Sequence, residues 1–137
     1  MTEDKIRELE TKYPFVNDPN DPELSFAYGV CRGWLDEFEK MCAEIAAVLK
    51  EYNCPLSTFQ FVQVKEKFGE MRVYWDLEFD FEHEDAATIY NKIDNIVDFH
   101  CAKTANICGV CGAPATVFSR GWVLPYCENC YHKISLT

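Results

Sequence analysis

The sequence has few basic residues and no long apolar run, and these two absences exclude several classes of protein. It contains 13 Lys and Arg against 23 Asp and Glu, a formal net charge of −10. Such a charge opposes broad attraction to nucleic-acid phosphates and to anionic lipid surfaces. No apolar segment approaches the roughly 20 residues that a membrane-spanning helix needs. The opening segment MTEDKIRELE is charged where a secretory signal would be basic and then apolar, so we expect a cytoplasmic protein.

The motifs of several common enzyme classes are also missing. The sequence contains no G-x-S-x-G, no phosphate-binding loop and no H-E-x-x-H. We therefore predict no catalytic residues and a protein that is not an enzyme. One enzymatic hypothesis stays open, in which Lys65, Lys67 or Arg72 acts with a nearby carboxylate in a reaction that the spacing does not specify.

Length and composition predict one packed body with a small appendage. Of the 137 residues 48% are hydrophobic, which is enough for a core. Residues 105–137 hold two cations and one acid, a net charge of +1, which leaves −11 for residues 1–104. We predict an acidic body over 1–104 and a four-cysteine tail over 105–137.

Hydrophobic periodicity in the body predicts three helices. Residues 3–12 form the first, and Tyr13-Pro14 ends it. The segment PFVNDPNDPEL, with its three prolines, is expected to be a loop. A third helix is expected over EDAATIYNKIDNIVDFHCAK. The second helix is expected over the preceding segment CRGWLDEFEKMCAEIAAVLKEY. Its apolar residues recur at spacings of three and four and form one wide stripe, which favours a core helix over a coiled-coil dimer. The residues of this stripe are Trp34, Phe38, Met41, Ile45, Val48 and Tyr52.

Between the second and third helices the period changes to two. In MRVYWDLEF apolar and polar residues alternate, as in a half-buried antiparallel strand, and TFQFVQV supplies a second strand. The two flank KEKFGE, where Gly69 can supply a positive φ. We therefore predict an α+β fold in which helices pack on a β-hairpin.

Four of the eight cysteines form two matched pairs near the end of the sequence. Cys108 and Cys111 are separated by two residues, as are Cys127 and Cys130, and fifteen residues lie between the pairs. Four thiolates at this spacing form the tetrahedral set that structural Zn²⁺ prefers, which predicts a zinc-ribbon or treble-clef-like knuckle. A closed four-sulfur site leaves no position for substrate. Iron and a dithiol redox pair are alternatives, and His132 could replace one ligand.

Two charged segments are candidate contact surfaces. Lys65, Lys67 and Arg72 surround one loop with Phe68 at its tip, which suggests an anion or partner contact; a solvated turn is the simpler alternative. The acidic segment DLEFDFEHED, residues 76–85, could face a basic protein or a hard cation, or could simply be solvated.

The remaining histidines and cysteines are expected to be structural. His100 continues the apolar stripe of its helix, which predicts a buried, hydrogen-bonded histidine. The unpaired Cys31, Cys42, Cys54 and Cys101 are expected to be small buried apolar residues.

The hairpin and the tail together resemble a known group of sequences. FQFVQVKEKFGEMRVYW, followed by CGVCGAPA, RGW and YCENC, is similar to small uncharacterised proteins of bacteria and their prophages. Those proteins carry a QVKEKFG-x-x-R hairpin ahead of a terminal zinc knuckle. The resemblance spans roughly residues 59–130. It implies a mobile-element context and the cytoplasm of a bacterial host, and it brings no known activity.

These observations lead to three functional hypotheses. We favour a small zinc-stabilised binding protein, phage- or prophage-associated, that inhibits or modulates a host protein by protein–protein contact. A nucleic-acid-handling protein is one candidate for that host protein. Its acidic surface would speed encounter with a basic partner. The alternative is a nucleic-acid-binding zinc-ribbon module that uses Arg120 and the aromatic residues of the tail. The third is the enzyme described above. The sequence does not predict an oligomeric state.

Overall fold

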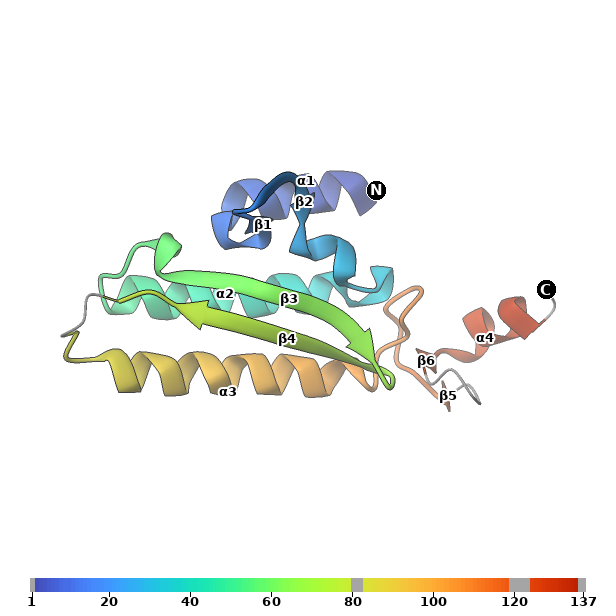
Figure 1. Ribbon diagram of the computed structural model, residues 1–137. Coiled ribbons are helices and arrows are strands. Elements are labelled where there is room, and N and C mark those ends of the chain that lie inside the picture. The colour runs from blue at the N-terminus through green and yellow to red at the C-terminus, as the bar shows by residue number, and fades with distance from the viewer. Residues whose placement is uncertain (1, 80–82, 119–123, 136–137) are drawn as a thin grey trace.

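A long antiparallel hairpin forms the centre of the fold, and two long helices pack on one of its faces (Figure 1). The computed structural model describes residues 2–79, 83–118 and 124–135. Helices packed on a hairpin confirm the predicted α+β class. The hairpin comprises β3 (Phe59–Lys67) and β4 (Glu70–Leu77). The long helices are α2 (Leu35–Glu51) and α3 (Ala86–Thr104).

Smaller elements surround this centre. In Figure 1, α1 and the hairpin β1–β2 lie on one side of β3, while β5, β6 and α4 lie beyond the tip of β3–β4. Within the described ranges, no helix is both long and apolar enough to cross a membrane. The bounds are α1 Thr2–Lys12, β1 Asn17–Asp18, β2 Asp21–Ser25, β5 Val117–Phe118, β6 Pro125–Tyr126 and α4 Glu128–Ser135; the 3-10 turns are η1 Pro14–Val16, η2 Phe26–Gly29, η3 Arg32–Trp34 and η4 Leu56–Thr58.

The segment expected to be a loop contains the short hairpin β1–β2. Its turn is stabilised by side-chain oxygens that accept backbone hydrogen bonds. Asp18 Oδ1 accepts from the Asn20 amide at 2.8 Å, and Asp21 Oδ1 accepts from the Glu23 amide at 3.0 Å. The prolines and Asn-Asp pairs correctly indicated a turn. The loop prediction missed the two short strands, β1 and β2, that these local hydrogen bonds help to align.

The predicted apolar stripe of α2 lies in the core. Phe38 of α2 stacks on Phe61 of β3 with ring centroids 5.4 Å apart. The helix ends in a Schellman motif, in which the amides of Cys54 and Asn53 donate to the carbonyls of Leu49 and Lys50, and Asn53 has a φ of +58°. The largest fully buried side chains are Leu9, Phe15, Trp34, Phe38, Met41, Ile45, Leu49, Phe59, Phe61, Met71, Ile89 and Ile93.

The two faces of the β3–β4 hairpin differ as the alternation predicted. Residues directly opposite each other share a face, so the pairs Val64–Val73 and Phe61–Trp75 point toward the helices. Lys65 and Arg72 are paired on the outer face. The register shifts between Phe61 and Gln63, which is a bulge that sequence periodicity did not reveal.

Candidate metal centre and the surfaces around it

The four paired cysteines converge on one point. Their sulfur atoms all lie within 4.8 Å of one another, and the Sγ atoms of Cys111 and Cys127 are 3.6 Å apart. Among the residues that the structure describes, this is the only group of three or more potential ligand side chains close enough together to hold a metal ion. The cluster could therefore hold a metal, and its donor set is consistent with zinc.

Backbone hydrogen bonds shape the turn that carries the first pair. The Cys108 amide donates to the Ala113 carbonyl at 2.7 Å, and the Gly112 amide donates to the Cys108 carbonyl at 3.0 Å. Gly112 has a φ of +86°, a conformation that costs glycine little. This turn places the sulfur atoms of Cys108 and Cys111 in the same cluster.

The second pair lies at the start of a helix rather than in a second turn of the same kind. Cys127 immediately precedes α4, and Cys130 is in its first turn. The Cys127 sulfur accepts a hydrogen bond from the Cys130 amide at 3.4 Å. Of the two architectures expected from the spacing, a helix that presents the second pair matches the treble-clef-like one. Residues 119–123, which include Arg120 and the aromatic residue Trp122 of the nucleic-acid-binding alternative, lie outside the described residues.

The electrostatic environment of the cluster favours thiolate at Cys108. Burial of this thiol works to raise its pKa, but backbone hydrogen bonds at Cys111, Cys127 and Val110 outweigh burial and lower the pKa to about 6. Sulfur must be deprotonated to bind a metal ion, so a cluster that stabilises thiolate is suited to a cation. A hydrogen bond with Cys127 raises the pKa of Cys130 to about 12.

Residues of the body hold the first cysteine turn in place. The Gly33 amide donates to the Gly109 carbonyl at 3.0 Å, and the indole Nε1 of Trp34 donates to the Ile107 carbonyl at 2.8 Å. Trp34 is fully buried in the main core. The predicted body (1–104) and tail (105–137) are therefore joined by hydrogen bonds across their boundary.

Four residues predicted to contact a partner form the hairpin tip, the name used below for Lys65, Lys67, Phe68 and Arg72. Phe68 and Gly69 form a two-residue loop with φ values of +55° and +82°. The Phe68 side chain is 74% exposed. Lys67 Nζ lies 5.6 Å from the Phe68 ring centroid, and Lys65 Nζ lies 5.7 Å from that of Tyr74.

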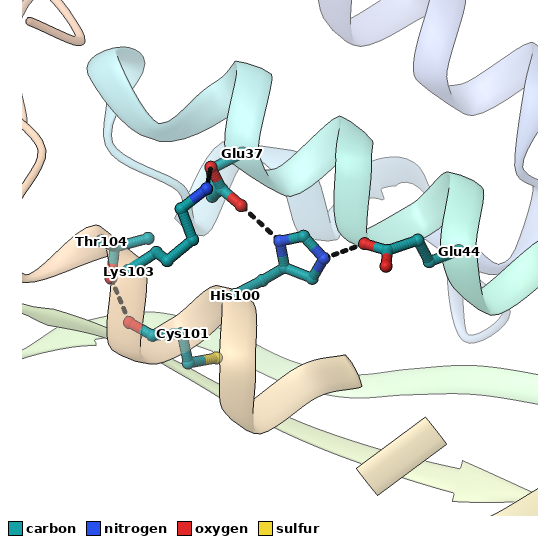
Figure 2. A network of polar contacts seen from close by, with 6 residues as sticks. All are labelled: Glu37, Glu44, His100, Cys101, Lys103 and Thr104. Atoms are coloured by element: carbon teal, nitrogen blue, oxygen red, sulfur yellow. Dashed lines mark hydrogen bonds and ion pairs between the residues drawn. The ribbon is translucent and has the colours of Figure 1, made fainter. Parts of the chain in front are cut away.

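His100 is buried and hydrogen-bonded, as predicted, and its partners were not foreseen. Figure 2 shows its ring nitrogens facing Glu37 and Glu44 of α2. Lys103 Nζ lies 3.4 Å from the second oxygen of Glu37. One histidine of α3 thus contacts two carboxyl groups of α2, and the network links the two helices.

The ionisation of Glu37 follows from this contact. Burial works to raise its pKa, but the hydrogen bond with His100 and the nearby positive charges of His100 and Lys103 outweigh burial and lower the pKa below its usual value. No sequence motif signals the network, since Glu37 and His100 are 63 residues apart.

The unpaired cysteines differ in burial. Cys42 and Cys101 are buried as predicted, while Cys31 and Cys54 are only partly buried. Cys54 Sγ lies 3.7 Å from Nε2 of His83. The acidic segment 76–85 is described only in part, because residues 80–82 lie outside the described ranges; its remaining acids join no candidate metal cluster there.

Comparison of the chain with protein-family models, with curated proteins and with solved structures finds no match, so the arrangement of the four cysteines is the feature from which its function is inferred.

Proposed function

We propose that this chain is a small zinc-stabilised, non-enzymatic binding protein that acts by contact with another protein. One observation carries the proposal: four cysteine sulfurs converge on a single point in a segment hydrogen-bonded to the buried core. A metal held there would stabilise the fold of the C-terminal segment. A rigid, preorganised surface is what a binding protein presents to its partner.

Cys108, Cys111, Cys127 and Cys130 would hold the ion. Four sulfur donors complete a tetrahedral zinc site, so the ion would supply cross-linking and charge neutralisation to the knuckle. The strands β5 and β6 have two residues each, and few buried side chains support them: Cys108, Tyr126 and Cys130. Such a small core needs additional stabilisation, which the metal would provide.

The polar groups inside the body support a binding role more than a catalytic one. The buried charges of Glu37 and His100 are paired with each other across α2 and α3. Such pairing satisfies their hydrogen bonds and fixes the spacing of the two helices. The network therefore has a structural explanation.

A protein partner fits the charge of the molecule. The net charge of −10 repels nucleic acid and favours encounter with a protein whose surface is neutral or basic. Taken with the resemblance to bacterial and prophage sequences, this supports a phage- or prophage-associated inhibitor or modulator of a host protein.

Capture of partners from a bacterial lysate tests the proposal. The tagged full chain is incubated at low and moderate salt, beside the same chain in which Cys108→Ser and Cys111→Ser remove two metal ligands. We expect a stoichiometric protein partner with the unmodified chain and its loss with the double variant. Recovery of no stoichiometric protein at either salt concentration would contradict the proposal, and recovery of nucleic acid instead would favour the nucleic-acid-binding alternative.

A further inference from the structure

We propose that the hairpin tip is the surface through which the protein contacts its partner, and that Phe68 enters an apolar pocket with an acidic rim on the partner protein. The inference rests on the proposed function, because it specifies the surface and the partner chemistry of that binding activity. It depends on the backbone conformation, exposure and charge of the tip.

Phe68 occupies a position where a different residue would favour folding. It is the first residue of a two-residue hairpin loop whose two residues both have positive φ, +55° and +82°. Such loops strongly prefer Asn-Gly or Asp-Gly, because a left-handed conformation is costly for a bulky side chain. Gly69 meets this preference, and Phe68 does not.

The side chain of Phe68 gains nothing from burial that would offset this cost. It is 74% exposed, the highest value among the large apolar side chains of the described residues. A strained backbone combined with an exposed aromatic ring is typical of a residue that serves binding. The contact of Lys67 with this ring lies at an exposed site and offsets little of the backbone cost, so the stability of the free protein does not account for phenylalanine here.

Lys67 lies over this ring, and Lys65 and Arg72 form a cross-strand pair farther from the turn. Across the described ranges, no carboxylate forms an ion pair with Lys65, Lys67 or Arg72. The nearby Glu66 is oriented to the turn, where its Oε2 accepts a hydrogen bond of 2.9 Å from the Gly69 amide. The tip is therefore an apolar knob flanked by unpaired cations, and its complement is an apolar pocket flanked by carboxylates.

The acidic body does not cancel the charge of the tip. Along β4, Arg72 and Asp76 are four residues apart, a separation of roughly 13 Å at about 3.3 Å per residue. The Debye length at physiological ionic strength is about 8 Å. Charges in the acidic segment beyond Asp76 are thus screened from the tip, where the three cations Lys65, Lys67 and Arg72 outnumber the two acids Glu66 and Glu70.

The geometry of the tip favours a protein over nucleic acid. Single-stranded nucleic acid binds by stacking successive bases on several aromatic rings, whereas the hairpin tip offers the one exposed ring of Phe68. Nucleic acid would also meet the repulsion of the whole chain. A single ring that projects from a tight turn instead fits a pocket.

The hairpin is also held rigidly, which lowers the entropic cost of binding. The Met71 amide donates a hydrogen bond of 2.9 Å to Oγ1 of Thr104, which is fully buried in α3. With the Glu66–Gly69 bond, this fixes β4 directly after the turn. The tip is therefore preorganised for contact.

Phe68→Asn separates binding from folding. Because Asn-Gly is the preferred turn, we expect the thermal midpoint of the full chain to rise by about 3 °C. We expect affinity for the partner captured by the unmodified chain, then purified, to fall at least tenfold. Phe99→Gln is the matched control, since Phe99 is a 58% exposed aromatic residue on α3, and it should bind within twofold.

A charge-reversal pair tests the acidic rim. Lys67→Glu should weaken binding at least tenfold, whereas Lys40→Glu, which changes the net charge equally at an exposed site on α2, should not. A labelled single-stranded oligonucleotide is measured in parallel. The inference is overturned if Phe68→Asn leaves the partner affinity unchanged or fails to raise the thermal midpoint. It is also overturned if Lys67→Glu and Lys40→Glu have the same effect on binding. Binding of the oligonucleotide that Phe68→Asn abolishes would overturn it as well. Failure of the unmodified chain to capture any protein would instead overturn the proposed function.

Discussion

The buried amide of Met71 donates its hydrogen bond to the side chain of Thr104, not to a neighbouring strand. The Thr104 carbonyl in turn accepts a bond of 3.1 Å from the Ile107 amide, one residue before the first cysteine of the candidate metal centre. Thr104 therefore connects the hairpin, the end of α3 and the start of the knuckle. The proposed contact surface and the candidate metal centre share one structural support.

Removal of the Thr104 hydroxyl should destabilise the protein without changing its shape. Thr104→Val preserves the volume but leaves the Met71 amide buried without an acceptor, which costs about 1–3 kcal/mol. Thr104→Ser keeps the hydroxyl and serves as the control. Urea denaturation measures both, and equal stability of the valine variant and the unmodified chain would refute this role for Thr104.

Gly33→Ala should displace the knuckle from the body. A Cβ at position 33 would lie 2.0 Å from the Cys108 carbonyl oxygen and 2.6 Å from the Gly112 nitrogen, both backbone atoms. We expect a loss of about 3 kcal/mol, comparable to overpacking of a core, with a change in Trp34 fluorescence. Gly109→Ala is the control, because its Cβ would meet only the Leu124 side chain, at 3.3 Å. Equal stability of Gly33→Ala and Gly109→Ala would show that the close packing of Gly33 on the knuckle is unimportant.

The contribution of Glu37 to stability should depend on pH. Its pKa is lowered in the folded protein, so its contribution is present above the unfolded value, near 4.5, and is lost as the pH falls through the lower folded value. Glu37→Gln should cost about 3 kcal/mol at pH 7, because it leaves His100 with one charged partner fewer. The difference between the two chains should shrink below pH 4.

This difference is measured by urea denaturation of both chains at each pH, so that effects of acid on the four cysteines cancel. A difference that is constant from pH 7 to pH 3 would show that the Glu37 carboxylate is not responsible. A difference that grows on acidification would show that the sign is wrong.

Chelation of the metal should disorganise the knuckle and, through Thr104, the adjacent hairpin tip, while the long helices α2 and α3 remain folded. Because the indole of Trp34 donates to the Ile107 carbonyl, we expect its fluorescence to change on addition of a strong chelator, while far-UV circular dichroism keeps the signal of α2 and α3. Affinity for zinc should fall with decreasing pH, since protons compete for the sulfurs. Unchanged fluorescence after complete removal of zinc would contradict the coupling.

The sequence predicted elements that depend on local patterns. The apolar stripe from Trp34 to Val48 predicted a helix, and the alternation in MRVYWDLEF predicted β4 with its two faces. The paired cysteines predicted their own convergence, because two tight pairs at that spacing have few other uses.

Features that depend on tertiary contacts could not be predicted. The partners of His100 are 56 and 63 residues away in sequence, so periodicity placed the histidine in the core without naming Glu44 or Glu37. The role of Gly33 also emerges only when η3 meets the knuckle. The exposure of Phe68 was suggested by its loop, but its left-handed backbone was not.

The central claim is that one zinc ion, bound by four sulfurs, organises the C-terminal segment. Native mass spectrometry of the purified chain tests it directly, with Cys111→Ser as the ligand variant and Cys31→Ser as the control outside the cluster. The account predicts one zinc ion per unmodified chain and per control, and none on Cys111→Ser at submicromolar free zinc. A folded, metal-free unmodified chain, or equal zinc on both variants, would contradict it.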